Sequence, residues 1–182
     1  MATSSRTDLI VSGAAIFISL CTLVVLLYEA RIMREQQRAA VWPYVEIGMG
    51  FGNRGFAVRT TNQGVGPARI QAMEVRVDGE PMRTWDEMLD TLGIETTSSS
   101  EDRTNGRVLP AQSTIPSLQI QSDASASLDA LQKTYVAGER LVFAVCYCSV
   151  YDECWRLEAR GLDETREPVE ACTPDPDADF RR

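Results

Sequence analysis

The sequence predicts a mainly β protein, with an N-terminal transmembrane helix followed by an immunoglobulin-like antiparallel β-sandwich that carries one or two short helices. Three observations predict this class. Residues 9–28 are apolar and carry no charge. The hydrophobic period changes at Trp42-Pro43, and beyond it short extended runs alternate with turn residues.

The apolar segment LIVSGAAIFISLCTLVVLLY, residues 9–28, predicts a membrane-spanning helix that follows a short N-terminal tail, residues 1–8. At about 1.5 Å rise per residue, its length matches a hydrocarbon core of about 30 Å. A cleavable signal peptide has a shorter apolar region of roughly 7–15 residues and a small-residue cleavage motif. Here YEARIMRE follows instead, which favours an uncleaved anchor with the lipid bilayer as its first partner.

The charges beside the span predict its orientation. Arg31, Arg34 and Arg38 follow it, whereas only Arg6 and the amino terminus precede it. Positive charges favour the cytoplasmic side. We therefore expect a single-pass protein of the inner (cytoplasmic) membrane with its soluble domain in the cytoplasm. The reverse topology would place four cysteines in an oxidising space.

A helical stalk is expected over residues 29–41, because this segment holds good helix formers and neither glycine nor proline. Trp42-Pro43 ends it, since proline lacks the N–H that a helix needs. The β-sandwich domain is predicted over residues 42–162. Its first two strands are expected in YVEIGM and FAVRTT, the second with Phe56, Val58 and Thr60 on one face.

The glycines of NQGVGPARI, residues 62–70, could suggest a phosphate-binding loop. Such a loop ends in Lys-Ser/Thr and opens a helix, whereas Arg69-Ile70 begins another extended run. We therefore predict a tight corner between two strands. The apolar phase shifts between Ile70 and Met73, which predicts a β-bulge in the following strand.

Two short helices and a late hairpin are predicted further on. TWDEMLDTLG has Thr84 as N-cap, Glu87 to complete a capping box, and Gly93 as a stop. SDASASLDALQKTY permits a second helix. RLVFAVCYCSV is apolar enough for a central strand, and CWRLEARG is its expected hairpin partner. The acidic, proline-containing residues 163–182 predict a disordered tail that folding does not need.

The segment CYCSVYDECW places three cysteines around the predicted hairpin turn. Alternation puts Cys146 and Cys148 on one face of a strand, with side chains about 6–7 Å apart, which suits a zinc site poorly. We expect reduced cysteines and no bound metal in the cytoplasm. A Cys148–Cys154 disulfide becomes plausible in an oxidising compartment. The alternative is a metal or redox site built from Cys146, Cys148, Cys154 and Cys172.

Composition excludes several functions. A net charge of -8 without a basic stripe argues against nucleic-acid binding. The chain has no histidine, which excludes Ser-His and Cys-His nucleophile pairs. The carboxylates of Asp86, Glu87 and Asp90 fit the exposed face of a capped helix. No catalytic or cofactor-binding residue is predicted, no cofactor is expected, and the protein is not expected to be an enzyme.

Three motifs, REQQRAAVWPY, NQGVGPA and YCSVYDECW, give the chain a resemblance to a group of uncharacterised bacterial single-pass membrane proteins. These have one N-terminal span, a short stalk, an Asn-x-Gly-x-Gly-Pro-Ala turn and a Tyr-Cys-Ser-x-Tyr-x-x-Cys-Trp hairpin before their end. The resemblance implies this architecture and no reaction.

The expected function is therefore that of a membrane-anchored β-sandwich for protein–protein interaction, or an accessory protein, without catalytic activity. Its partner is expected to be another membrane or cytoplasmic protein. The alternative function is a cysteine-based metal-binding or redox module at the membrane.

Overall fold

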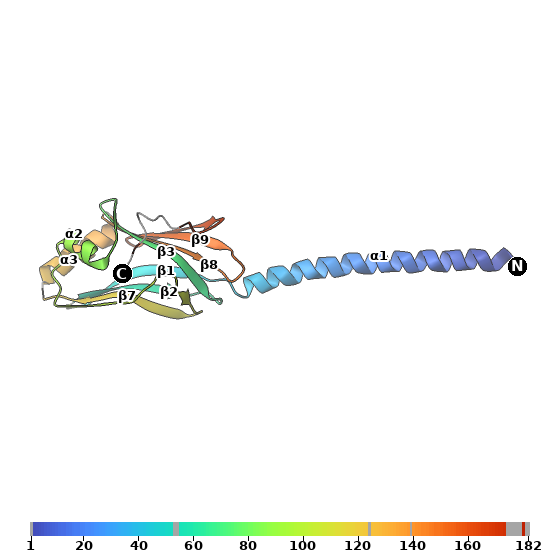
Figure 1. The fold of residues 1–182 in the computed structure, drawn as a ribbon, viewed down its shortest axis with the longest axis horizontal. Helices are drawn as coiled ribbons and strands as arrows, with labels where there is room; N and C mark the ends of the chain where they lie inside the picture. The colour runs from blue at the N-terminus through green and yellow to red at the C-terminus, as the bar shows by residue number, and fades with distance from the viewer. Residues whose placement is uncertain (1, 53–54, 124, 139, 174–179, 181–182) are drawn as a thin grey trace. The chain divides into compact units, whose positions relative to one another are not determined.

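The computed structural model describes residues 2–52, 55–123, 125–138, 140–173 and 180. It forms two compact units, Met1–Ala40 and Val41–Arg182. The first is a single helix and the second contains the two sheets (Figure 1). The fold is mainly β, as predicted.

Helix α1 (Ala2–Ala39) is continuous through the apolar segment and the expected stalk. It is long and apolar enough to cross a membrane, with a mean hydropathy of 2.6 in its most apolar part. Within the apolar segment, the hydroxyls of Ser19 and Thr22 donate to backbone carbonyls one turn earlier. These hydroxyls therefore need no partner outside the helix. The helix ends at Ala39, slightly before the predicted limit of the stalk.

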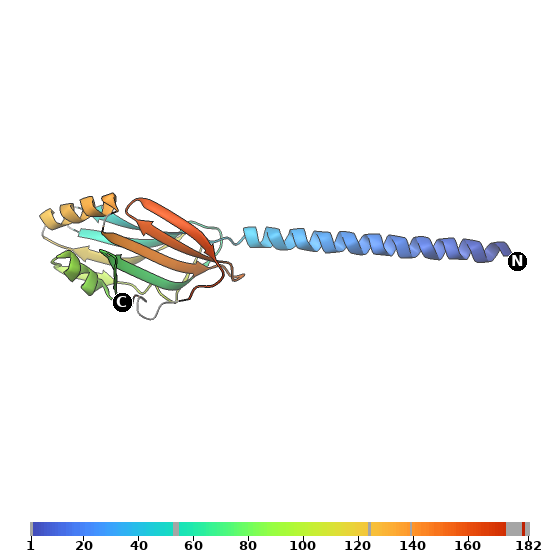
Figure 2. The same cartoon turned by 90° about the horizontal axis from the view of Figure 1, so that it is seen from above.

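The second unit is a sandwich of two antiparallel sheets (Figures 1 and 2). The first sheet has the order β1 (Val45–Gly52), β2 (Gly55–Asn62), β7 (Ser113–Gln121) and β5 (Ser98–Glu101). The second has the order β10 (Asp163–Val169), β9 (Cys154–Arg160), β8 (Leu141–Cys148), β3 (Ala68–Val77) and β4 (Glu80–Met82), and β6 (Val108–Leu109) pairs with β3. Helices α2 (Trp85–Leu92) and α3 (Ser125–Ala137) lie at the same end of the sandwich.

The core lies between the sheets. Every residue of β8 is buried, as expected of a central strand. In β2, Phe56, Val58 and Thr60 are buried on the predicted common face. The register of β3 against β8 shifts between Ile70 and Ala72, which confirms the predicted bulge.

Helix α2 has the capping expected from its sequence. The Thr84 side chain accepts a hydrogen bond from the Glu87 N–H at 3.2 Å, and Gly93 ends the helix in the left-handed conformation with φ 68°. The Glu87 carboxylate accepts from the Arg83 N–H at 2.6 Å. Glu87 therefore caps the beginning of helix α2.

The prediction of a disordered tail is wrong for a large part of residues 163–182. Asp163–Val169 form strand β10, which pairs with β9 along its full length. Further on, Phe180 is buried, its ring lies 4.6 Å from that of Trp85, and its N–H donates to the Met73 carbonyl at 3.0 Å. The prediction of disorder rested on the charged residues and prolines of this segment. Strand β10 lies at the edge of its sheet, where charged residues and proline are both tolerated.

Strand β10 also joins the two sheets through its side chains. Arg166 donates to the Val45 carbonyl at 2.6 Å, and its guanidinium carbon lies 3.7 Å from the centre of the Tyr44 ring. The Glu164 carboxylate accepts from the Ile47 N–H at 3.2 Å, and burial raises the pKa of this carboxyl. These contacts satisfy backbone groups on the edge of β1 that has no neighbouring strand.

Candidate functional site

The NQGVGP segment forms a corner that is filled by its own asparagine. Asn62 is fully buried. Its amide nitrogen contacts three backbone carbonyls, those of Gly66 at 2.8 Å, Leu109 at 3.1 Å and Pro110 at 3.1 Å. Its oxygen accepts from the N–H groups of Tyr44 at 3.1 Å and Gly64 at 3.0 Å. The side chain thus joins the beginning of β1, the corner and the end of β6.

The glycines of this corner allow close backbone approach. A Cβ atom on Gly66 would lie 1.8 Å from the Val41 carbonyl oxygen, and one on Gly64 would lie 2.4 Å from the Tyr44 nitrogen. The N–H groups of Val65 and Gly66 donate to the Trp42 carbonyl at 3.0 and 3.3 Å. Because these amides already have partners within the chain, the corner is structural, as the sequence predicted.

The CYCSVYDECW segment is a hairpin, as predicted, with Cys148 and Cys154 directly opposite each other in the register of β8 and β9. The buried Ser149 hydroxyl accepts from the N–H groups of Tyr151 at 3.1 Å and Glu153 at 3.3 Å. Asp152, at the tip of the turn, pairs with Arg69 at the beginning of β3. The turn is therefore held both internally and from the neighbouring strand.

The four cysteines of the domain are oxidised, contrary to the expectation of free thiols. Cys148 is bonded to Cys154, and Cys146 is bonded to Cys172. Among the residues that the structure describes, Cys21 is the free cysteine. The sequence offered no direct signal for the Cys146–Cys172 pair, because that bond requires the segment after β10 to return across the second sheet.

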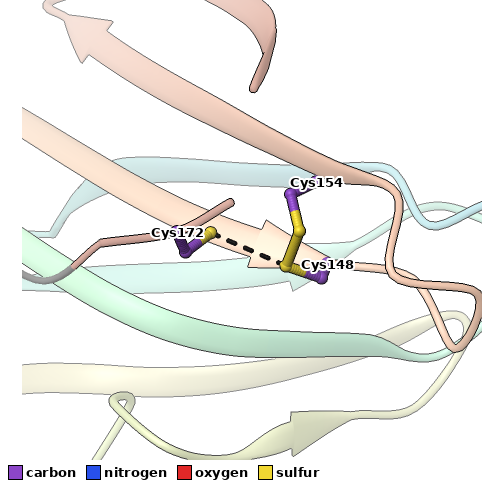
Figure 3. Close-up of side chains that lie close together, drawn as sticks. All are labelled: Cys148, Cys154 and Cys172. Atoms are coloured by element: carbon purple, nitrogen blue, oxygen red, sulfur yellow. Dashed lines mark hydrogen bonds between the residues drawn. A yellow bond between two sulfur atoms is a disulfide. The ribbon is translucent and has the colours of Figure 1, made fainter. Parts of the chain in front are cut away.

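The two disulfides are in contact with each other. The Sγ atom of Cys148 lies 3.7 Å from that of Cys172 (Figure 3). The Sγ atoms of Cys148, Cys154 and Cys172 all lie within 4.8 Å of one another. Metal ligation by cysteine uses the thiolate. The four residues of the predicted alternative metal site are thus brought together, but both bonds would have to be reduced before they could hold an ion.

The NQGVGP corner and the turn of the CYCSVYDECW hairpin lie at the same end of the sandwich, because Arg69, shortly after the corner, is the register partner of Cys148. Helices α2 and α3 lie at the opposite end (Figure 1). Large hydrophobic side chains that are exposed in the described part of the domain are Trp42, Val65, Val108, Val136, Val150, Tyr151 and Leu162. Five of the seven belong to segments at this end: Trp42, Val65, Val108, Val150 and Tyr151. We call these five residues the loop-end patch.

Backbone contacts hold the segments of the loop-end patch together. The Val65 N–H donates to the Trp42 carbonyl. In the strand registers, Arg69 is the partner of both Val108 and Cys148. The side chain of Arg69 also pairs with Asp152, the residue after Tyr151. Segments far apart in the sequence therefore present apolar side chains from one end of the fold.

A second surface feature is an open hollow of about 490 Å³ on the first sheet. It is lined by Gly50, Phe51, Gly52, Gly55, Phe56, Ala57, Arg59, Ser98, Ser99, Ser100, Gln119, Ile120 and Gln121. Among the lining residues that the structure describes, Arg59 is the charged group, and these residues include no carboxylate, cysteine or histidine. This lining offers no nucleophile with an adjacent base.

The carboxylates considered in the sequence lie elsewhere, on helix α2. Asp86 and Asp90 are exposed, and Glu87 caps the helix. The structure does not bring these groups to the hollow. Comparison of the chain with protein-family models, with curated proteins and with solved structures gives no match.

Proposed function

We propose that the protein is a membrane-anchored β-sandwich that binds another protein through the loop-end patch and is not an enzyme. The observation that carries this proposal is the concentration of exposed apolar side chains at one end of the domain. Val65 is 65% exposed and Tyr151 is 44% exposed. Exposed apolar groups that occur together on a soluble surface are typical of interaction sites.

The rigidity of this end supports a binding role. Asn62 fixes the corner that carries Val65, while the Cys148–Cys154 bond closes the hairpin that carries Val150 and Tyr151. A surface held in its binding conformation loses less entropy when a partner docks. Loops on a rigid β-sandwich are common binding elements for this reason.

We also propose on which side of the membrane the β-sandwich domain lies. The arginines after the span favour the cytoplasm, whereas two disulfides favour an oxidising compartment. We place the domain on the oxidising side of a bacterial cytoplasmic membrane, because four cysteines from β8, β9 and the segment after β10 meet in two pairs. The partner is then a membrane protein or a soluble protein of that compartment.

Site-specific photo-crosslinking of the full chain in its own membranes tests this proposal. A photoreactive side chain at Val65 or at Tyr151 is expected to give an adduct of one discrete mass. The control position is Leu162, which is 74% exposed at the other end of the domain. A photoreactive side chain there is expected to give no adduct. A Val108→Asp substitution should weaken the adduct at Tyr151 by roughly thirtyfold, equivalent to about 2 kcal/mol for a central interface residue.

The outcomes of this experiment show which surface binds the partner, the loop-end patch or the hollow on the first sheet. An equal adduct at Leu162, or no adduct at either patch position, contradicts the proposal. A photoreactive group at Ser100 examines the hollow on the first sheet in the same way. An adduct at Ser100 alone would assign binding to the hollow instead of the loop-end patch.

A further inference from the structure

The contact between the two disulfides has a chemical consequence. Thiol–disulfide exchange proceeds when a thiolate attacks a sulfur of a disulfide and displaces the other sulfur. The Cys148 and Cys172 sulfurs belong to different bonds, yet only 3.7 Å separates them. If either becomes a thiolate, its target already lies beside it.

Burial determines which bond an external thiol reaches first. Cys146, Cys148 and Cys154 are 8%, 4% and 8% exposed, respectively, whereas Cys172 is only partly buried. Cys172 also lies outside the regular strands, in the segment after β10. Cys172 is therefore the most exposed of the four cysteines, and we take it as the point of attack.

The surroundings of Cys146 suit it as the displaced sulfur. Arg156 is its register partner on β9. The Glu74 carboxylate is shared between Arg156, at 2.8 and 3.1 Å, and Arg76, at 2.7 Å. Glu158 also acts electrostatically on Arg156. Arg156 is thus the cationic side chain on the strand position directly opposite Cys146, and a positive charge beside a cysteine favours its thiolate form.

We propose that the four cysteines form one thiol–disulfide exchange unit whose substrate is a dithiol reductant. One thiolate of the reductant attacks the Cys172 sulfur, a mixed disulfide forms, and the Cys146 thiolate is released. The second thiol of the reductant, as its thiolate, resolves the mixed disulfide, which leaves an oxidised reductant and a Cys172 thiolate. That thiolate attacks the Cys148 sulfur and displaces the Cys154 thiolate.

The exchange conserves atoms and electrons. The reductant supplies two electrons and becomes a disulfide, and its two protons end on the thiols of Cys146 and Cys154. The protein keeps one disulfide, which now joins Cys148 to Cys172. The half-reduced protein thus contains the Cys148–Cys172 bond in place of the original Cys148–Cys154 bond. This rearrangement needs no second equivalent of reductant.

Partial reduction of the full chain tests this inference. In a Cys21→Ser background, the protein is treated with one molar equivalent of dithiothreitol, quenched with acid, alkylated and mapped by mass spectrometry. The expected product contains a Cys148–Cys172 linked peptide with alkyl groups on Cys146 and Cys154. Its yield should exceed that from protein treated in denaturant by roughly tenfold, because folding raises the local thiol concentration.

Half-reduced protein that contains only the original pairs, Cys148–Cys154 or Cys146–Cys172, would overturn the proposal. A second variant gives an independent result. With Cys146 and Cys154 both changed to Ser, the remaining Cys148 and Cys172 are expected to form a bond when the folded protein is exposed to oxidised glutathione. Two free thiols in a folded variant, as judged by its near-ultraviolet circular dichroism, would equally contradict the exchange.

Discussion

Removal of residues 163–182 is expected to prevent the domain from folding. This truncation deletes strand β10, the Arg166 and Glu164 contacts to β1, and the Cys146–Cys172 bond. Loss of a native disulfide costs about 2–5 kcal/mol, and loss of a buried phenylalanine such as Phe180 costs about 3–5 kcal/mol. Together they consume most of the roughly 5–15 kcal/mol that stabilises a typical domain.

Thermal unfolding followed by circular dichroism measures this effect in the full chain and the truncated one. A matched control ends after Thr173 and keeps β10 and Cys172 while it loses Phe180. The control should still unfold cooperatively, at a lower temperature than the full chain. A chain truncated after Leu162 that melts at the same temperature as the full chain would contradict the structural role of β10.

Replacement of Asn62 by Ala is expected to cost at least about 4 kcal/mol of unfolding free energy. The change leaves several buried backbone groups without a partner, and each such group costs about 1–3 kcal/mol. The neighbouring substitution Gln63→Ala is the control, because the Gln63 side chain is exposed. Denaturant unfolding of both variants provides the comparison. Equal midpoints for the two would show that Asn62 does not hold the corner.

A second substitution tests whether close backbone packing also stabilises this corner. Gly66→Ala would place a methyl group 1.8 Å from the Val41 carbonyl oxygen, which forces the backbone apart. Its loss of stability is expected to be comparable to that of Asn62→Ala, although no hydrogen-bonding side chain is removed.

Local patterns in the sequence were sufficient for much of the fold. The alternation at Phe56 and Val58 predicted a buried strand face, and Thr84 with Glu87 predicted the beginning of α2. The glycines of the NQGVGP segment predicted a corner. Each of these signals depends on residues close together in the chain, where backbone geometry imposes a fixed period.

The failures involve contacts over long sequence separations. Arg166 looks like part of a solvated tail until its guanidinium is placed over the Tyr44 ring. Composition cannot distinguish a charged edge strand from a disordered segment. The Cys146–Cys172 bond and the loop-end patch were missed for the same reason, since both require segments distant in sequence to meet. The arginines beside the span then led to the expectation of reduced cysteines.

Cysteine labelling of the full chain in its own cells tests most directly whether the domain is a disulfide-closed sandwich on the oxidising side of the membrane. Cells are quenched rapidly with acid, and the denatured chain is treated with a mass-tagged maleimide before and after reduction. We expect a tag on Cys21 alone before reduction and four further tags on Cys146, Cys148, Cys154 and Cys172 after it. Tags on all five cysteines without reductant would contradict both the disulfides and the proposed side of the membrane.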